Sequence, residues 1–288
     1  MGAYHKRQMF ERVDLHTHSH YSDGVLAPAA LVALAAQRQV GALALTDHDT
    51  TAGCTEAAAA CTEHGIVFIN GTELTAGWRG QEIHIVGLGL DTQHPALQAR
   101  TAELLALRRA RIAAIGQLLA RERALAGEDI ATALLQQPGV PTRLHLAREL
   151  VSRGLATDQQ DAFDRWLGRK RPGHVPQQWP GIEGAIEAIV ASGGIAVLAH
   201  AHRYKFSTGV LGELCAAFKS AGGRGIEVSL PGTSPADTAR LLRQARLHGL
   251  AGSVGSDFHQ PGFAWRPVGR FAKLPDDIAP VLAQLLPQ

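Results

Sequence analysis

The sequence predicts an α/β fold in which strands and helices alternate around a parallel sheet or barrel. Short apolar runs alternate with helical patterns over the first ninety residues and again after about residue 180. The chain has 288 residues, of which 45% are hydrophobic and 19% are charged, which fits one soluble globular unit or a core with an embedded subdomain. This composition excludes a disordered chain, a collagen and a coiled coil.

The first ninety residues contain four predicted strands, each ending in polar residues. FERVDLH (10–16) predicts the first strand. Pro28 begins a helix after it, because proline at the first helical position gives up only a donor that has no partner there. The next strands are predicted in ALALTDHD (42–49) and IVFINGTEL (66–74). EIHIVGLGL (82–90) has the continuous apolar character of a buried strand.

Residues 95–180 are predicted to form an inserted helical cap subdomain, between the two parts of a barrel domain at 1–94 and 181–288. Apolar residues recur every three to four positions from 94 to about 126. PTRLHLARELVSRG and DQQDAFDRWL predict two further helices. From residue 100 to residue 171, 13 Lys+Arg against 8 Asp+Glu give +5, and the rest carries 15 − 18 = −3. This segment would either hold an anionic substrate or form a solvated helical face.

The strand and helix alternation resumes after residue 180. The predicted elements are a helix over 182–191, a strand over 194–200, a helix over 210–222, a strand over 225–230, a helix over 235–248 and a strand over 250–259.

The chain shows no signal for a membrane or for secretion. No run approaches the ~18 apolar residues of a membrane span, and the first fourteen residues lack the apolar core of a secretory signal. Cys54, Cys61 and Cys215 form neither a disulfide framework nor a CxxC pair, which indicates reduced thiols. We therefore expect a cytoplasmic protein, with no membrane, duplex-DNA or evident protein partner.

Histidine is unusually common in this chain, with 14 His against 3 Tyr and 2 Met. Six histidines and three carboxylates fall where predicted strands end, and in α/β barrels functional groups gather at the rim formed by those ends. We therefore expect nine metal ligands in one cleft: His16, His18, Asp23, His48, Glu73, His84, His200, Asp257 and His259.

Divalent metal ions are the expected cofactors. Six imidazoles and three carboxylates cannot share a buried pocket without a cation, because the carboxylates repel one another and the imidazole donors need acceptors. Nitrogen and oxygen donors without thiolate suit Mn²⁺, Zn²⁺ or Fe²⁺, and three to four ligands per ion imply two or three ions, with Glu73 as a natural bridge. Such a cluster lowers the pKa of a bound water to about 7 and favours phosphate esters as substrates.

Together these motifs resemble the PHP (polymerase and histidinol phosphatase) superfamily of metal-dependent phosphoesterases. DLHTHSHYSDG, TDHDT, AVLAH and GSDFH match its four motifs in order, and GTE and EIHIVG supply the remaining ligands. The resemblance implies a distorted (β/α)7 TIM-like barrel and a trinuclear site, for which Mn²⁺ is the first expectation. It also implies three ligand sets: His16, His18, Glu73 and Asp257 for one ion; Glu73, His84 and His200 for a second; Asp23, His48 and His259 for a third.

The insertion resembles one branch of that superfamily. PTRLHLARELVSRG, FDRWLGRKRPGHVP and AVLAHAHRYK are similar to the branch that includes 3′,5′-nucleoside bisphosphate phosphatase and a 5′-to-3′ exoribonuclease. The resemblance implies removal of the 3′-phosphate from a nucleoside 3′,5′-bisphosphate, such as adenosine 3′,5′-bisphosphate, to give the 5′-monophosphate. The alternative is exonuclease action on short 5′-phosphorylated RNA. Histidinol phosphatase is less favoured, because the insertion resembles the nucleotide-handling branch more closely.

Catalytic roles are expected for Asp23, His48 and Glu73. Metal-bound water, Asp23 and His48 are open alternatives for protonating the leaving alkoxide. Arg143 is the first candidate to clamp a phosphate, because its guanidinium stands near a predicted helix start, which also favours anions. Arg203 and His145 are further candidates for substrate binding.

Two other functional classes compete with this hypothesis. An amidohydrolase also begins with HxH on its first strand and ends with Asp on its last, but it predicts a bridging Lys in mid-chain, where Glu73 has the bridging role here. A metal-binding or partner-binding module without activity would be expected to have lost part of the ligand set, which is complete in this chain.

Overall fold

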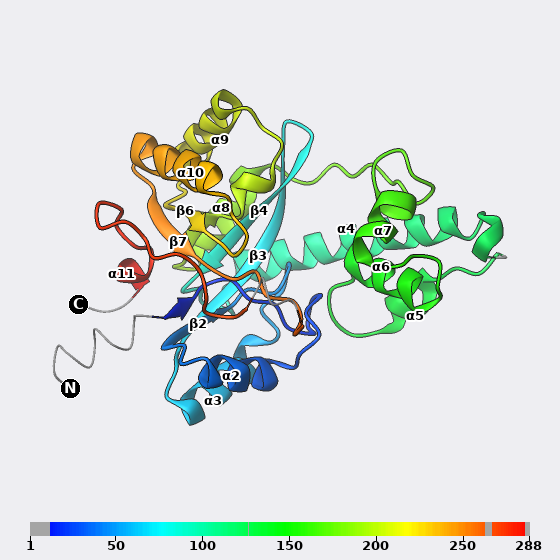
Figure 1. The fold of residues 1–288 in the computed structure, drawn as a ribbon, viewed down its shortest axis with the longest axis horizontal. Helices are drawn as coiled ribbons and strands as arrows, with labels where there is room; N and C mark the ends of the chain where they lie inside the picture. The colour runs from blue at the N-terminus through cyan, green and yellow to red at the C-terminus, as the bar shows by residue number, and fades with distance from the viewer. Residues whose placement is uncertain (1–11, 126, 263–266, 286–288) are drawn as a thin grey trace.

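Seven strands form one sheet in the computed structural model, which describes residues 12–125, 127–262 and 267–285 (Figure 1). Positions 10 and 11 of the predicted first strand lie outside the described residues. The strands follow one another in sequence order around the sheet. They are β1 (Val13–Asp14), β2 (Ala42–Leu45), β3 (Val67–Trp78), β4 (Gln81–Leu88), β5 (Ile195–Leu198), β6 (Gly225–Ser229) and β7 (Ala251–Val254).

The sheet curls into a nearly closed barrel, which confirms the predicted fold class. β1 pairs with β2 in parallel. The residues after β1 meet those after β7: the N–H of His18 donates to the carbonyl of Phe258 at 2.9 Å, and the N–H of Asp257 donates to the carbonyl of His16 at 2.8 Å. Gly255 permits this approach, because a Cβ there would lie 2.4 Å from the Cβ of His16. The first and last motifs are therefore neighbours.

One part of the barrel departs from the predicted parallel order. β4 is antiparallel to both β3 and β5. Arg79 (φ 48°) and Gly80 (φ 74°) form the two-residue turn of the β3–β4 hairpin, where left-handed residues match the twist of the strands. His84 was predicted at the end of a strand and instead lies near the start of β4. Because β4 runs in the opposite direction, its start reaches the same rim as the ends of the parallel strands.

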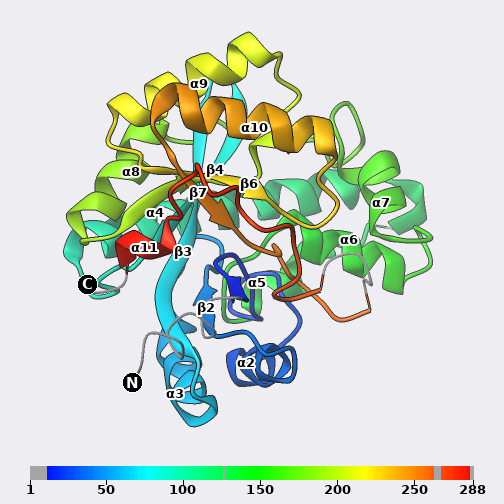
Figure 2. The same ribbon diagram turned by 60° about the vertical axis from the view of Figure 1, so that its left-hand side comes forward.

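Helices cover the outside of the barrel. In Figure 2, α9 and α10 lie above the barrel, and α2 and α3 lie below it. The predicted proline start is confirmed, since Pro28 occupies the first turn of α2. The predictions at 182–191 and 235–248 coincide with α8 and α10. The covering helices are α2 (Pro28–Gln37), α3 (Cys54–His64), α8 (Ile182–Ala191), α9 (Thr208–Ser220), α10 (Pro235–His248) and the short α11 (Leu282–Leu285), with the 3₁₀ turn η3 (Ala201–Arg203).

The remaining helices project to one side of the barrel (Figure 1). They pack around an apolar cluster of their own that includes Ile112, Leu146, Leu150 and Trp166. The sequence predicted three of these helical segments and missed α5. The elements are α4 (Pro95–Leu119), the 3₁₀ turn η1 (Arg123–Leu125), α5 (Ala131–Gln136), α6 (Arg143–Ser152), α7 (Gln159–Ala162) and the π-helix η2 (Phe163–Leu167). The domain boundaries at 94 and 181 stay a prediction.

No helix among the described residues has both the length and the apolar character needed to cross a lipid bilayer.

Candidate metal centre

Glu73, on β3, lies at the centre of the predicted ligand cluster and is fully buried. Burial opposes ionisation of its carboxyl group, but the surrounding imidazoles, led by those of His48, His16 and His84, outweigh it and hold the pKa of Glu73 well below its usual range. Five imidazole nitrogens surround its two oxygens. Oε1 lies 3.0 Å from Nδ1 of His84 and 2.9 Å from Nε2 of His200; Oε2 lies 3.2 Å from Nε2 of His16, 3.3 Å from Nε2 of His18 and 3.1 Å from Nδ1 of His48.

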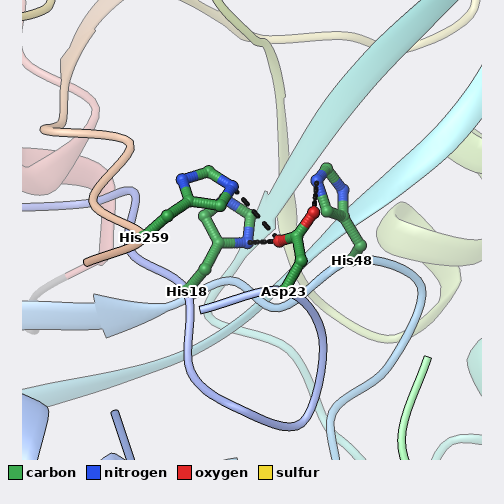
Figure 3. A group of neighbouring side chains, drawn as sticks. All are labelled: His18, Asp23, His48 and His259. Carbon is green, nitrogen blue, oxygen red and sulfur yellow. Dashed lines mark ion pairs between the residues drawn. The ribbon is translucent and has the colours of Figure 1, made fainter. Parts of the chain in front are cut away.

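Asp23 is the centre of a second group, formed with His18, His48 and His259 (Figure 3). Its Oδ1 lies 3.1 Å from Nε2 of His259 and 3.9 Å from Nδ1 of His18. Its Oδ2 lies 3.7 Å from Nε2 of His48. These side chains come from three separate loops, which follow β1, β2 and β7.

Asp257 completes the ligand cluster from the loop after β7. Its Oδ1 lies 3.2 Å from Nε2 of His18 and 3.5 Å from Nε2 of His16, and its Oδ2 accepts a hydrogen bond from Arg203. Asp257 (φ 52°) and His200 (φ 29°) both have left-handed backbones, as has Asp49 (φ 50°) beside His48. Strained residues of this kind are concentrated at functional sites, where the surrounding structure holds them.

The cluster fits divalent metal ions. Nε2 of His16 and Nε2 of His18 face each other at 3.1 Å, and two imidazole lone pairs at that distance need a proton or a cation between them. Within the part of the chain that the structure describes, three sets of nitrogen and oxygen atoms are compact enough to hold an ion: His16, His18, Glu73 and Asp257; His18, Asp23, His48 and His259; and His48, Glu73 and His84. Among the same residues, five buried atoms of the predicted ligands make no hydrogen bond of good geometry: His18 Nδ1, Asp23 Oδ1, His48 Nδ1, Glu73 Oε2 and His200 Nδ1.

A cleft of about 610 Å³ opens beside the cluster and reaches the projecting helices. Its lining includes Glu73 and His200 at one end and Arg143 and Phe163 at the other. This volume lies within the range of small-molecule sites. The cluster is therefore accessible to a substrate of moderate size.

Two of the three predicted substrate-binding residues line the cleft, and the third lines another cavity. Arg143 is the first residue of α6 and lines the cleft, as does Arg203. His145 lines a separate cavity among α5 and α6, where its Nδ1 accepts the N–H of Thr142 at 3.0 Å in a capping box.

Several known proteins and one family model match this chain, and three of these matches are related. Residues 14–110 match the model of the PHP domain family. The chain is 40% identical to the 3′,5′-nucleoside bisphosphate phosphatase of Chromobacterium violaceum, over 95% of this chain and 96% of that protein. It is 42% identical to a 5′-3′ exoribonuclease of Haemophilus influenzae, over 95% of this chain and 98% of that protein.

The chain belongs to the PHP family. It is a hydrolase that acts on phosphate esters, as the sequence predicted. A solved structure from Chromobacterium violaceum, named an amidohydrolase and holding sulfate but no metal, superposes with a TM-score of 0.87 at 39% identity, covering 95% of each chain. The PHP fold of this chain is thus shared over nearly its whole length.

Glu227 supports the ligands of this PHP site and was not predicted from the sequence. It stands on β6, whose sequence GIEVS carries no motif. Its Oε1 lies 2.7 Å from Nδ1 of His16, and its Oε2 accepts the N–H of His200 at 2.6 Å. Outer carboxylates of this kind fix the orientation and tautomer of ligating imidazoles.

Asp47 and Asp49, on either side of His48, also act as supports. The carboxylate of Asp47 accepts hydrogen bonds from the N–H and hydroxyl of Ser19 at 2.7 and 2.6 Å, which anchors the loop that carries Asp23. The carboxylate of Asp49 accepts the N–H of Thr75 at 2.7 Å and binds Arg108 of α4. Arg108 is thereby buried in a structural ion pair, outside the lining of the cleft.

Glu82 connects the PHP ligands to the projecting helices. It lies 3.3 Å from Nε2 of His84, 2.9 Å from Arg111 and 3.7 Å from Arg143, and it accepts the indole N–H of Trp179 at 2.8 Å. Burial opposes its ionisation, but these partners hold the pKa of Glu82 well below its usual range. The sequence offered no signal for this role, because all but one of its partners lie far away in the chain.

Proposed function

We propose that this PHP phosphoesterase removes the 3′-phosphate of nucleoside 3′,5′-bisphosphates, such as adenosine 3′,5′-bisphosphate, to leave the nucleoside 5′-monophosphate. The observation that carries the proposal is the cleft, which joins the cluster around Glu73 to the guanidinium of Arg143 within about 610 Å³. A bisphosphate offers one phosphate to the cluster and a second to a cation. The similarity to the 3′,5′-nucleoside bisphosphate phosphatase of Chromobacterium violaceum supports the same substrate.

Two or three divalent ions are proposed as cofactors, with Mn²⁺ first and Zn²⁺ or Fe²⁺ as alternatives. The nine predicted ligands would hold them, and Glu73 would be shared between ions because both of its oxygens face imidazole nitrogens. Divalent ions at this site supply Lewis-acid stabilisation of phosphoryl oxygens and lower the pKa of water.

The reaction exchanges one phosphorus–oxygen bond for another. The oxygen of a water forms a bond to phosphorus, the bond from phosphorus to the 3′-oxygen breaks, and one proton of that water is transferred in the net reaction to the 3′-oxygen. Asp23 and His48, adjacent at the rim, are the protein groups proposed to move that proton.

Two arginines are proposed to orient the substrate. Arg143 presents paired N–H donors that match a phosphate, and its position at the first turn of α6 adds the positive end of the helix dipole. Arg203 is held against Asp257 and lines the cleft. His145, whose Nδ1 is used in capping α6, is proposed to act through the position of that helix.

Exonuclease action on short 5′-phosphorylated RNA is the second candidate. The similarity to the 5′-3′ exoribonuclease of Haemophilus influenzae and the net charge of +5 between residues 100 and 171 favour it. A nucleoside 5′-phosphate is common to both substrates, so one cleft suits either.

The deciding experiment compares kcat/KM, with Mn²⁺ and at equal enzyme, for nucleoside 3′,5′-bisphosphates, a 5′-phosphorylated trinucleotide, mononucleotides and histidinol phosphate. The proposal expects the bisphosphates to be the best substrates and the 5′-monophosphate to be the product. A higher value for the trinucleotide would assign the exonuclease function instead.

A further inference from the structure

The cleft has two chemically different ends. One end consists of the ligand cluster. The other lies among the projecting helices and is lined by Arg143, Gln159, Gln160 and Phe163, with Gln260 from the loop after β7. This second end offers an aromatic ring and amide groups, and the carboxylate of Glu82, which also lines the cleft, is paired with Arg143 at 3.7 Å. Its composition suits a neutral, planar and polar group better than a second phosphate alone.

Phe163 is held rigidly where it lines the cleft. It is the first residue of the π-helix η2, a rare conformation found frequently at functional sites. Its carbonyl accepts the N–H of Gly168 at 2.7 Å, and a Cβ on Gly168 would lie 2.6 Å from that carbonyl oxygen, so glycine is required there. The buried side chains of Trp166 and Leu167 anchor the same turn in the apolar cluster of the projecting helices.

One part of the Phe163 ring packs against that apolar cluster, and the ring as a whole is only half-buried. Cζ of Arg143 lies over the ring at 5.7 Å from its centre, close to the ~6 Å limit of cation–π contact. Because the ring is only half-buried and lines the cleft, it keeps surface available there.

Tyr204, the other non-imidazole aromatic residue in the lining, has a different role. Its hydroxyl accepts the N–H of His84 at 2.9 Å, and its ring contacts that of His200 edge-on at 5.8 Å between centres. It is engaged in supporting the ligand cluster.

A series of contacts connects Phe163 to the reacting end of the cleft. Glu73 lies 3.0 Å from His84, which lies 3.3 Å from Glu82, and Glu82 lies 3.7 Å from Arg143 beside the ring. A nucleotide has the same order, with a phosphate, a ribose and then a flat base.

We propose that Phe163 is the platform on which the nucleobase of the substrate stacks. The inference rests on the proposed nucleotide substrate and assigns the base-binding subsite within it. Stacking on a phenyl ring uses the π-face that every base has, so purine and pyrimidine substrates should both gain from it. Phe163 thus selects nucleotides over phosphate esters that have no ring.

The test compares Phe163→Ala, Phe163→Leu and Phe163→Tyr with the wild-type enzyme on adenosine and uridine 3′,5′-bisphosphates and on base-free ribose 3,5-bisphosphate. Ala and Leu should raise KM for both nucleotides about tenfold, as the loss of one base stack predicts, and leave KM for the base-free compound unchanged. Tyr should restore wild-type KM because it keeps the ring. Phe68→Ala is the matched control, because Phe68 is also half-buried but packs on a different core cluster away from the cleft.

Equilibrium binding of adenosine 5′-monophosphate and ribose 5-phosphate to the same variants provides a second readout that does not depend on turnover. Wild type should bind the nucleotide more tightly than the sugar phosphate, and the difference should disappear in Phe163→Leu. Equal binding of both compounds to wild type, or an unchanged difference in the Leu variant, would overturn the platform. Failure of wild type to hydrolyse bisphosphates, with this binding difference intact, would overturn the proposed function alone.

Discussion

The Oε1 atom of Glu227 lies 2.7 Å from Nδ1 of His16, and both side chains are almost completely buried. The same carboxylate accepts the N–H of His200 through Oε2. One residue of β6 therefore orients two predicted ligands, of which His16 lies beside Oε2 of Glu73 and His200 beside Oε1.

Glu227→Gln should lower metal affinity about 10- to 100-fold, because an amide cannot orient the His16 ring as a carboxylate does. Metal titration of the apoprotein would measure this, with the exposed Glu183→Gln as a control that should bind as wild type does. An unchanged metal affinity in Glu227→Gln would contradict the proposed role of Glu227 in orienting the ligands.

The ion pair between Arg108 and Asp49 should contribute strongly to stability. Both side chains are buried, so Arg108→Ala leaves an uncompensated carboxylate and should cost about 3–5 kcal/mol in the free energy of unfolding. Urea unfolding would measure the loss. Arg165→Ala, which breaks an exposed pair with Asp161, should cost about 1 kcal/mol or less. Equal losses of unfolding free energy in the two variants would contradict a large stabilising contribution from the buried pair.

The three cysteines should be unreactive in the native protein. Burial raises the pKa of Cys54 to about 11 and those of Cys61 and Cys215 to about 12, so few thiolates exist at pH 8. Unfolded thiols ionise at lower pH, so the stability that these groups contribute falls as pH rises through about 9. A thiol reagent at pH 8 should label three groups in urea and react slowly without it; rapid native labelling would contradict the burial of these thiols.

The sequence motifs predicted which side chains would lie together in the ligand cluster. HxH after β1 and the polar residues after β2, β5 and β7 could be located because parallel strands bring their ends to one rim. The antiparallel hairpin of β3 and β4 could not be predicted, because an apolar run that forms a buried strand has the same composition in either direction. His84 therefore lies beside Glu73 in the structure, but at a different place in its strand from the one that the sequence predicted.

The supporting residues were beyond the reach of sequence patterns. Glu227 is one acid in an apolar strand, and Glu82 and Arg108 meet their partners across long stretches of chain. Their roles arise from tertiary contacts, which no local periodicity encodes. For Phe163 the sequence predicted only a place in a helix. The structure shows that this residue begins a π-helix and lines the cleft.

Metal content and phosphate release in Glu73→Gln test the central claim most directly. This variant keeps the shape of the side chain but removes the charge that five imidazoles share. It should hold fewer divalent ions per chain than wild type and release phosphate about a thousandfold more slowly, as loss of several kcal/mol of charge stabilisation predicts. Full metal content with undiminished turnover would contradict the claim that the cluster around Glu73 holds the metal ions used in phosphate-ester hydrolysis.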